Sequence, residues 1–312
     1  MSAIAAATTC ASPGCSQPAA SRCSRCLGSF YCSASCQRAH WRAHKPTCDA
    51  AAEQAAIFAS SGEADAKIER LKRLAGGGNA QCQYILATFH ERGVGMRADA
   101  REAARLYALA AAAGDADAQF ALALCYRDGI GVARDAAMSE GWMARAAAAG
   151  CAAAQCSLGF SSADAGEAVR RYELAAAAGD AVAQYNLALC YDEGKGVAAD
   201  AAKAVELYAL AANAGCADAQ FNLAVSHADG LGGLAADAAE AARWYARAAA
   251  VGHAGAQHNL ARCYERGEGV ALDFKLAADW FGKAAAQGVA EAAERRDVCL
   301  ARLAADASAR RA

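Results

Sequence analysis

The chain has 312 residues, a formal net charge of −2 and a hydrophobic fraction of 56%. The mild acidity argues against a general polyanion-binding protein. No stretch approaches the roughly 18 apolar residues that a membrane-spanning helix needs. The length allows two domains, and the composition changes early, because all three prolines precede residue 47.

The cysteine content and the N-terminus indicate the compartment. Fifteen cysteines occur, and the first ten residues carry neither a basic segment nor a long apolar one. We therefore expect no secretory signal peptide. Cysteines in a chain without an export signal favour metal binding over disulfides. The expected location is intracellular, in the cytoplasm or the nucleus, with no membrane partner.

The N-terminal segment concentrates potential metal ligands. Residues 10–48 hold seven cysteines and one histidine in the order Cys10, Cys15, Cys23, Cys26, Cys32, Cys36, His44 and Cys48. Eight ligands suffice for two closed tetrahedral zinc sites. A segment this short has too little core to fold unaided, so the metal must supply much of its stability. The alternative is a disulfide knot, and the histidine in register argues against it.

The same spacing resembles a MYND-type zinc finger, notably in Cys36-Gln37 and in Trp41-x2-His44-x3-Cys48. One departure is the four-residue gap after Cys10, where the family more often has two. The resemblance implies a cross-braced module with two structural Zn²⁺ ions. Site one would hold Cys10, Cys15, Cys32 and Cys36, and site two Cys23, Cys26, His44 and Cys48. The residues alone leave a sequential pairing equally open.

The resemblance also implies a surface that binds short proline-containing peptides, at positions matched here by Gln37 and Trp41. The alternative for Trp41 is that it only covers the zinc core. The cations among the ligands are interpreted as offsetting the charge of the thiolates, because five cations without a recognition helix form too thin a patch for nucleic acid. These cations are Arg22, Arg25, Arg38, Arg42 and Lys45.

Residues 49–79 are expected to form a linker and an N-terminal capping helix. The stretch from Glu63 to Ala75 places Ile68, Leu71 and Leu74 at helical spacing. It is similar to the second helix of the repeats that follow. We predict that it covers the exposed face of the first repeat.

From residue 80 the sequence repeats itself. The copies are marked at Gln83, Gln119, Gln155, Gln184, Gln220 and Gln257, and a Leu follows three residues after each. Intervals of 29 to 37 residues indicate stacked helix pairs. In the fourth copy, Gly194 and Gly196 should end the first helix, and Asp200 should cap the second. The equivalent Asp residues are Asp99, Asp135, Asp164, Asp237 and Asp273.

The pattern A-Q-x-x-L-A/G-x-x-Y-x-x-G-x-G-V-x-x-D…W-Y-x-x-A-A-x-x-G resembles the Sel-1-like repeat, a relative of the tetratricopeptide repeat. It covers residues 80–288 as six copies. The resemblance implies an all-α fold, a right-handed α-solenoid of helix pairs behind the small finger, with a scaffold or adaptor role. Residues 289–312 should form a C-terminal capping helix and tail. Its outer face should be exposed to solvent at Glu291, Glu294, Arg295, Arg296 and Arg302.

Two departures within the array carry further expectations. The third copy lacks seven residues and keeps only Ala163 between Ser162 and Asp164, which predicts a shortened first helix and a local change in superhelix curvature. Asn186, Asn222 and Asn259 precede the repeated Leu in three successive copies. In tetratricopeptide relatives an Asn at the matching place faces the concave groove and bonds a bound peptide. The alternative is a surface Asn without a partner.

The leading functional hypothesis is a non-enzymatic adaptor that binds protein or peptide segments through the finger and the solenoid groove. Outside the zinc ligands the sequence has no nucleophile–base set, Walker loop or dinucleotide fingerprint, and we expect no small-molecule substrate. Two alternatives are a non-catalytic accessory or regulatory subunit of an enzyme complex and a transcriptional co-regulator recruited through the finger. A third, a nucleic-acid-binding regulator, is disfavoured by the mild acidity.

Overall fold

The computed structural model describes residues 21–22, 30–31 and 64–309. Strand β1 (Ser21–Arg22) pairs antiparallel with β2 (Phe30–Tyr31), with Ser21 opposite Tyr31. The rest of the described chain contains fourteen helices, in the order α2 (Ala64–Gly76), α3 (Ala80–Arg92), α4 (Ala100–Ala112), α5 (Ala116–Asp128), α6 (Ala136–Ala148), α7 (Ala152–Ser161), α8 (Ala165–Ala177), α9 (Ala181–Glu193), α10 (Ala201–Asn213), α11 (Ala217–Asp229), α12 (Ala238–Ala250), α13 (Ala254–Arg266), α14 (Phe274–Ala286) and α15 (Ala292–Ala309). None of these helices is long and apolar enough to cross a membrane.

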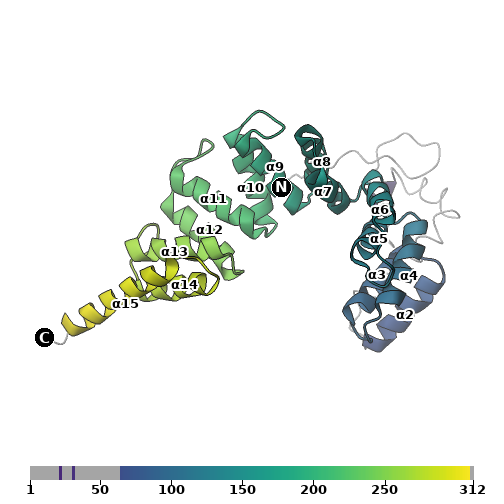
Figure 1. Cartoon of the computed structure of the whole chain (residues 1–312), viewed down its shortest axis with the longest axis horizontal. Helices are drawn as coiled ribbons and strands as arrows, with labels where there is room; N and C mark the ends of the chain where they lie inside the picture. Colours follow the sequence, from purple (N-terminus) through teal and green to yellow (C-terminus); the bar gives the residue numbers. More distant parts are fainter. Residues whose placement is uncertain (1–20, 23–29, 32–63, 310–312) are drawn as a thin grey trace. The chain divides into compact units, whose positions relative to one another are not determined.

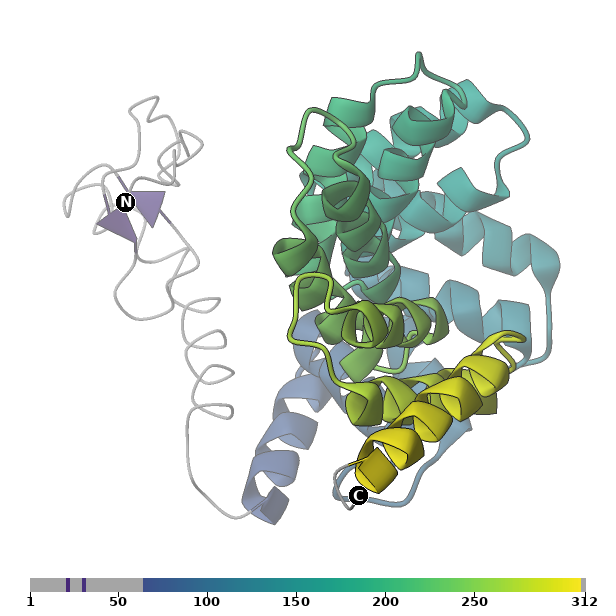
Figure 2. The same cartoon turned by 90° about the vertical axis from the view of Figure 1, so that its left-hand side faces the viewer.

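The helices stack in chain order within two compact units, α2 to α6 and α7 to α15, which divide between Ala149 and Gly150. In each unit every helix packs against the next one in the sequence, as Figures 1 and 2 show. The core of the first unit contains Leu86, Tyr107 and Leu122. The core of the second contains Tyr208 and Leu223. The predicted fold class, helix-pair repeats of an α-solenoid, is confirmed.

Aspartates begin the second helices, as the sequence predicted. Asp200 Oδ1 accepts a hydrogen bond from the backbone N–H of Lys203 at 3.0 Å. The cap satisfies one of the helix-start N–H groups that have no partner within the helix. The same cap is present at Asp99, Asp135, Asp164, Asp237 and Asp273.

The two glycines of the repeated turn have different tasks. Gly194 ends α9 in the left-handed region, at φ 69°, and its N–H donates to the Cys190 carbonyl. Gly196 also has positive φ, but a Cβ there would lie 2.4 Å from the Ala165 carbonyl oxygen, at the start of α8. The turn of one copy therefore packs against the second helix of the copy before. The sequence interpretation gave both glycines only the first task.

The glutamine that marks each copy joins neighbouring pairs. Gln220 is buried, and its Nε2 donates to the Ala212 carbonyl at the end of α10, at 3.1 Å. The equivalent bonds run from Gln83 to Ala75, Gln119 to Ala111, Gln184 to Ala176 and Gln257 to Ala249. These five bonds tie α3, α5, α9, α11 and α13 to the end of the helix before each of them.

Helix α2 occupies the place of a second helix before the first repeat. Ile68 and Leu71 are buried, and Leu74 packs partly on the same core. Gly95 of the first repeat approaches Ile68 of α2, just as Gly196 approaches α8. Helix α2 therefore packs on the first repeat, and its role as the N-terminal cap stays a prediction.

The other end differs in detail from the prediction. Helix α15 begins at Ala292, three residues later than the sequence suggested. On the predicted solvent-exposed face, Glu291, Glu294 and Arg302 are exposed and Arg295 and Arg296 are partly exposed. Two of these arginines also contact the preceding helix pair. Arg295 reaches Glu265, whose side chain is only 10% exposed, with an N–O distance of 3.1 Å, and the Arg302 guanidinium lies 5.2 Å from the centre of the Phe274 ring. The apolar and ionic contacts of the preceding pair extend across this face.

The third copy is shortened as predicted. Helix α7 has 10 residues, whereas the other first helices have 13. The expected change in superhelix curvature stays a prediction.

Candidate functional site

The predicted finger residues lie outside the described residues. They are Cys10, Cys15, Cys32, Cys36, Cys23, Cys26, His44 and Cys48, together with Gln37 and Trp41. The donor set of seven thiols and one imidazole fits two closed zinc sites in its chemistry. In the described residues, no group of three or more His, Cys, Asp or Glu side chains is placed to hold a metal ion.

Two residues of the asparagine column, Asn186 and Asn259, line two equivalent pockets between neighbouring helix pairs. The first, of about 490 Å³, is formed by α11, α12 and α13, and the second, of about 430 Å³, by α7, α8 and α9. Tyr245, Asn259 and Cys263 line the first, and Tyr172, Asn186 and Cys190 occupy the same repeat positions in the second. Asn222 lies one copy before Asn259 and lines neither pocket.

All three asparagines are half-buried and have partners inside the protein. Asn186 Nδ2 donates to Cys156 Sγ at 3.8 Å. The Asn222 side chain hydrogen-bonds to the hydroxyls of Tyr185 and Tyr208, and that of Asn259 to Tyr245. These partners exclude the alternative of a surface Asn without a partner. Peptide binding by the column stays a prediction.

Burial raises the pKa of tyrosine and cysteine side chains in and beside the two pockets. It raises the pKa of Tyr245, although the Asn259 hydrogen bond partly offsets the rise. It also raises the pKa of the Cys190 and Cys263 thiols and that of Cys156 to about 11. Thiols with a raised pKa are protonated near neutral pH and are poor nucleophiles. The prediction that the cysteines of the repeats are small buried residues is confirmed for Cys125, Cys190 and Cys263.

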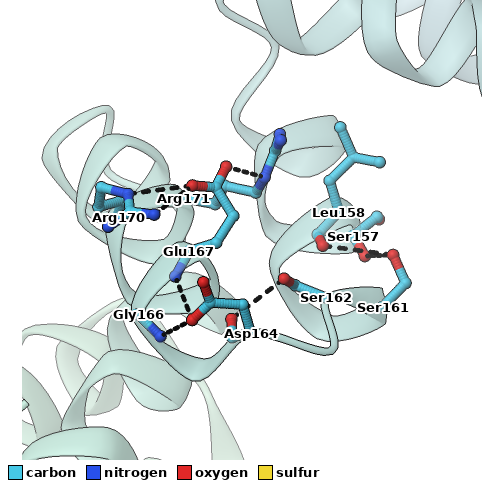
Figure 3. A network of polar contacts seen from close by, with 9 residues as sticks. All are labelled: Ser157, Leu158, Ser161, Ser162, Asp164, Gly166, Glu167, Arg170 and Arg171. Atoms are coloured by element: carbon cyan, nitrogen blue, oxygen red, sulfur yellow. Dashed lines mark hydrogen bonds and ion pairs between the residues drawn. The ribbon is translucent and has the colours of Figure 1, made fainter. Parts of the chain in front are cut away.

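An exposed aromatic ring lies near the short link in the third copy and lines the pocket there. Figure 3 shows how the link closes: Ser162 Oγ donates to the Asp164 carbonyl at 3.1 Å, and Asp164 caps α8. Glu167 pairs with Arg170 and Arg171 one turn later. Phe160 is 81% exposed and lines the pocket formed by α7, α8 and α9. The sequence interpretation did not single out this residue.

The two pockets differ in how many charged side chains line them. Arg262, Arg266, Asp229 and Glu268 line the first, whereas the second has Glu193 and Lys195 at its edge with Leu189 and Phe160 on its walls. Amide donors and acceptors, apolar walls and a few charges suit the binding of a polypeptide segment. The pockets hold no paired nucleophile and base.

Comparison with protein families identifies both parts of the chain. A model of the MYND finger matches residues 10–48. A model of the Sel1 repeat matches residues 80–115, 116–151, 181–216, 217–253 and 254–289, which is more than half of the chain. The shortened copy lies between the second and third of these matches.

Two solved structures are similar over most of the chain. A protective antigen of uropathogenic Escherichia coli strains, which displays an SLR fold, is 27% identical with a TM-score of 0.64; the match covers 86% of this chain and 59% of the antigen. A Sel1 repeat protein from Oxalobacter formigenes is also 27% identical, with a TM-score of 0.63, and the match covers 76% of this chain and 96% of that protein. This chain thus spans about three fifths of the length of the antigen. No curated protein matches it.

Proposed function

This chain belongs to the Sel1 repeat family, and on that basis we propose that it is a non-enzymatic adaptor that holds protein segments. In this proposal residues 10–48 form a zinc finger and residues 49–79 a linker with capping helix α2. Residues 80–288 form six repeats, and residues 289–312 a capping helix and tail. The observation that carries the proposal is the recurrence of the Asn–Tyr–Cys set in two pockets between neighbouring helix pairs.

The repeats offer a partner both polar and apolar contacts. An Asn side chain both donates and accepts hydrogen bonds, so Asn186 and Asn259 can pair with the backbone of an extended segment. Phe160 and Leu189 beside the first amide, and Val225 beside the second, offer apolar contacts for its side chains. We infer that one segment runs across the first helices and contacts both pockets.

The finger would hold two structural Zn²⁺ ions. Its matched family and its donor set support this assignment, and thiolates with Zn²⁺ tie together a segment too short to fold alone. The cysteines of residues 64–309 form no disulfides, which fits the reducing compartment that a thiolate finger needs.

Metal analysis tests the finger. We expect two zinc ions per chain in protein purified without added metal. A strong chelator should then make the seven cysteines of residues 10–48 reactive towards a thiol reagent, while the helical circular dichroism signal of the repeats persists. One ion or none, or cysteines that react only after reduction, would contradict the assignment.

Binding to peptide arrays tests the adaptor function. The purified full-length chain, loaded with zinc, would be incubated with an array of short peptides of varied sequence. We expect a subset of the peptides to bind. Some of these should still bind after zinc has been removed, because they contact the repeats and not the finger. Absence of binding to any peptide would contradict the proposal, as would turnover of a bound peptide by the chain alone.

A further inference from the structure

One column of equivalent positions on the first helices changes from apolar to charged along the second unit. Three residues after each asparagine position stand Phe160 in α7, Leu189 in α9, Val225 in α11 and Arg262 in α13. Three of these side chains are apolar, and the last carries a guanidinium. Val225 and Arg262 line the same pocket, so the last apolar residue of this column shares its pocket with a cation.

Arg262 differs from the other arginines around it. It is half-buried and forms no ion pair with any residue in the described part of the chain. Its neighbours are paired: Arg266 with Glu268, Arg295 with Glu265 and Arg243 with Glu240. A guanidinium that is partly withdrawn from water and forms no ion pair gains more from a carboxylate than an exposed one does.

The charge of Arg262 acts inside the pocket. Burial lowers the pKa of His258, and the Arg262 charge lowers it further. Burial raises the pKa of Tyr245 and Cys263, and Arg262 offsets part of both rises. The positive potential therefore reaches groups that line the pocket or lie next to it.

The other charged side chains of the pocket limit the charge of the anion that it can bind. Asp229 and Glu268 line it together with Arg262 and Arg266, so its formal charges balance. Asp229 and Glu268 repel any anion, but they repel a phosphate with two charges more strongly than a carboxylate with one, which Arg262 alone can neutralise. The Asn259 amide lies beside it as a second donor.

We propose that the pocket between α11, α12 and α13 receives an acidic side chain, Asp or Glu, of the bound protein segment, and that Arg262 pairs with its carboxylate. The inference rests on the proposed function and adds the chemistry of the partner to it. The segment would place apolar side chains along Phe160, Leu189 and Val225 and its acidic residue at the α13 end.

Peptide libraries with one fixed central residue test the inference. The probes are three labelled mixtures that differ only in that residue, which is Glu, Gln or phosphoserine, and their affinity for the full-length chain is measured by fluorescence anisotropy. We expect the chain to bind the Glu mixture about tenfold more tightly than the Gln mixture, a ratio that corresponds to about 1.4 kcal/mol. Arg262→Gln should bring the ratio close to one.

Two matched variants separate this role from general charge and from folding. Arg243→Gln removes an exposed arginine outside the pocket and should leave the ratio unchanged. Leu189→Arg places a guanidinium at the equivalent position of the other pocket and should strengthen the preference for Glu. Should Arg262→Gln fail to fold, Leu189→Arg decides: a stronger preference supports the inference, and an unchanged one overturns it.

Failure of this inference differs from failure of the proposed function. If the chain binds all mixtures but does not distinguish Glu from Gln, or if folded Arg262→Gln keeps the preference, the acidic anchor is wrong and the adaptor function stands. Tighter binding of the phosphoserine mixture than of the Glu mixture also overturns the anchor. Binding of no mixture at all contradicts the adaptor function itself.

Discussion

At the residue scale, local roles follow from the sequence and non-local ones do not. The aspartate caps could be predicted because the cap and its N–H donors lie within three residues of one another. The glutamine column was visible as a pattern, but its role was not. Its partner is a carbonyl eight residues earlier, on the preceding helix pair. The pattern specifies the residue, and only the packing reveals the bond.

Replacing one of these glutamines tests the bond between pairs. Gln220→Ala should lower the free energy of unfolding of the chain by about 1 kcal/mol, the usual net value of one hydrogen bond. The loss stays modest because the Ala212 carbonyl also accepts the Gly215 N–H. Urea denaturation measures the change, with Glu206→Ala on an exposed surface of α10 as the control. Equal stability of the two variants would show that the glutamine bond contributes nothing.

At the element scale, helix limits were predictable and the contacts between elements were not. The turns and the second-helix starts occur where glycine and aspartate predicted them. The position of α15 and the pairing of Arg295 with Glu265 depend on the surface of the preceding pair, which periodicity does not describe. The exposure of Phe160 and its place in the wall of a pocket appear only in three dimensions.

The two glycines of one turn allow a matched comparison. Gly194→Ala and Gly196→Ala both place a Cβ at positive φ, which costs roughly 1–2 kcal/mol. The Cβ at position 194 has no neighbour closer than 3.4 Å, whereas at position 196 it lies 2.4 Å from the Ala165 carbonyl oxygen. We therefore expect Gly196→Ala to be clearly the less stable variant in thermal denaturation. Equal losses would mean that the contact with α8 relaxes freely.

At the scale of the whole molecule, the repeat period predicts the stack, because a helix pair cannot bury its apolar face without a neighbour. The sequence therefore predicted the all-α repeat fold and the helix before the first repeat. The column Asn186, Asn222 and Asn259 was recognised as well. The two pockets, their tyrosines and Arg262 were not, since they depend on side chains from three helices at once.

Weakening α2, the first helix of the described stack, tests whether each helix pair is stabilised mainly by its immediate neighbours. Leu71 of α2 is 1% exposed and packs in the core of the first repeat. Leu71→Ala should cost about 2–5 kcal/mol locally, and hydrogen exchange should rise first in α3. The exposed Lys72→Ala serves as the control. A uniform loss of protection along all helices would contradict nearest-neighbour stacking.

The central claim is that the groove of the repeats binds a protein segment through its asparagine column. The most direct measurement is the dissociation constant of an array-selected peptide for the wild-type chain and for the Asn186→Ala, Asn222→Ala, Asn259→Ala triple variant. At about 1 kcal/mol for each lost contact, we predict that the triple variant binds the peptide roughly a hundredfold more weakly than the wild-type chain. Its helix content and melting temperature should stay at the wild-type values. The fold should survive because Tyr208, one partner of Asn222, also donates to Asp192 at 3.3 Å. An unchanged dissociation constant, or collapse of the fold, would contradict the claim.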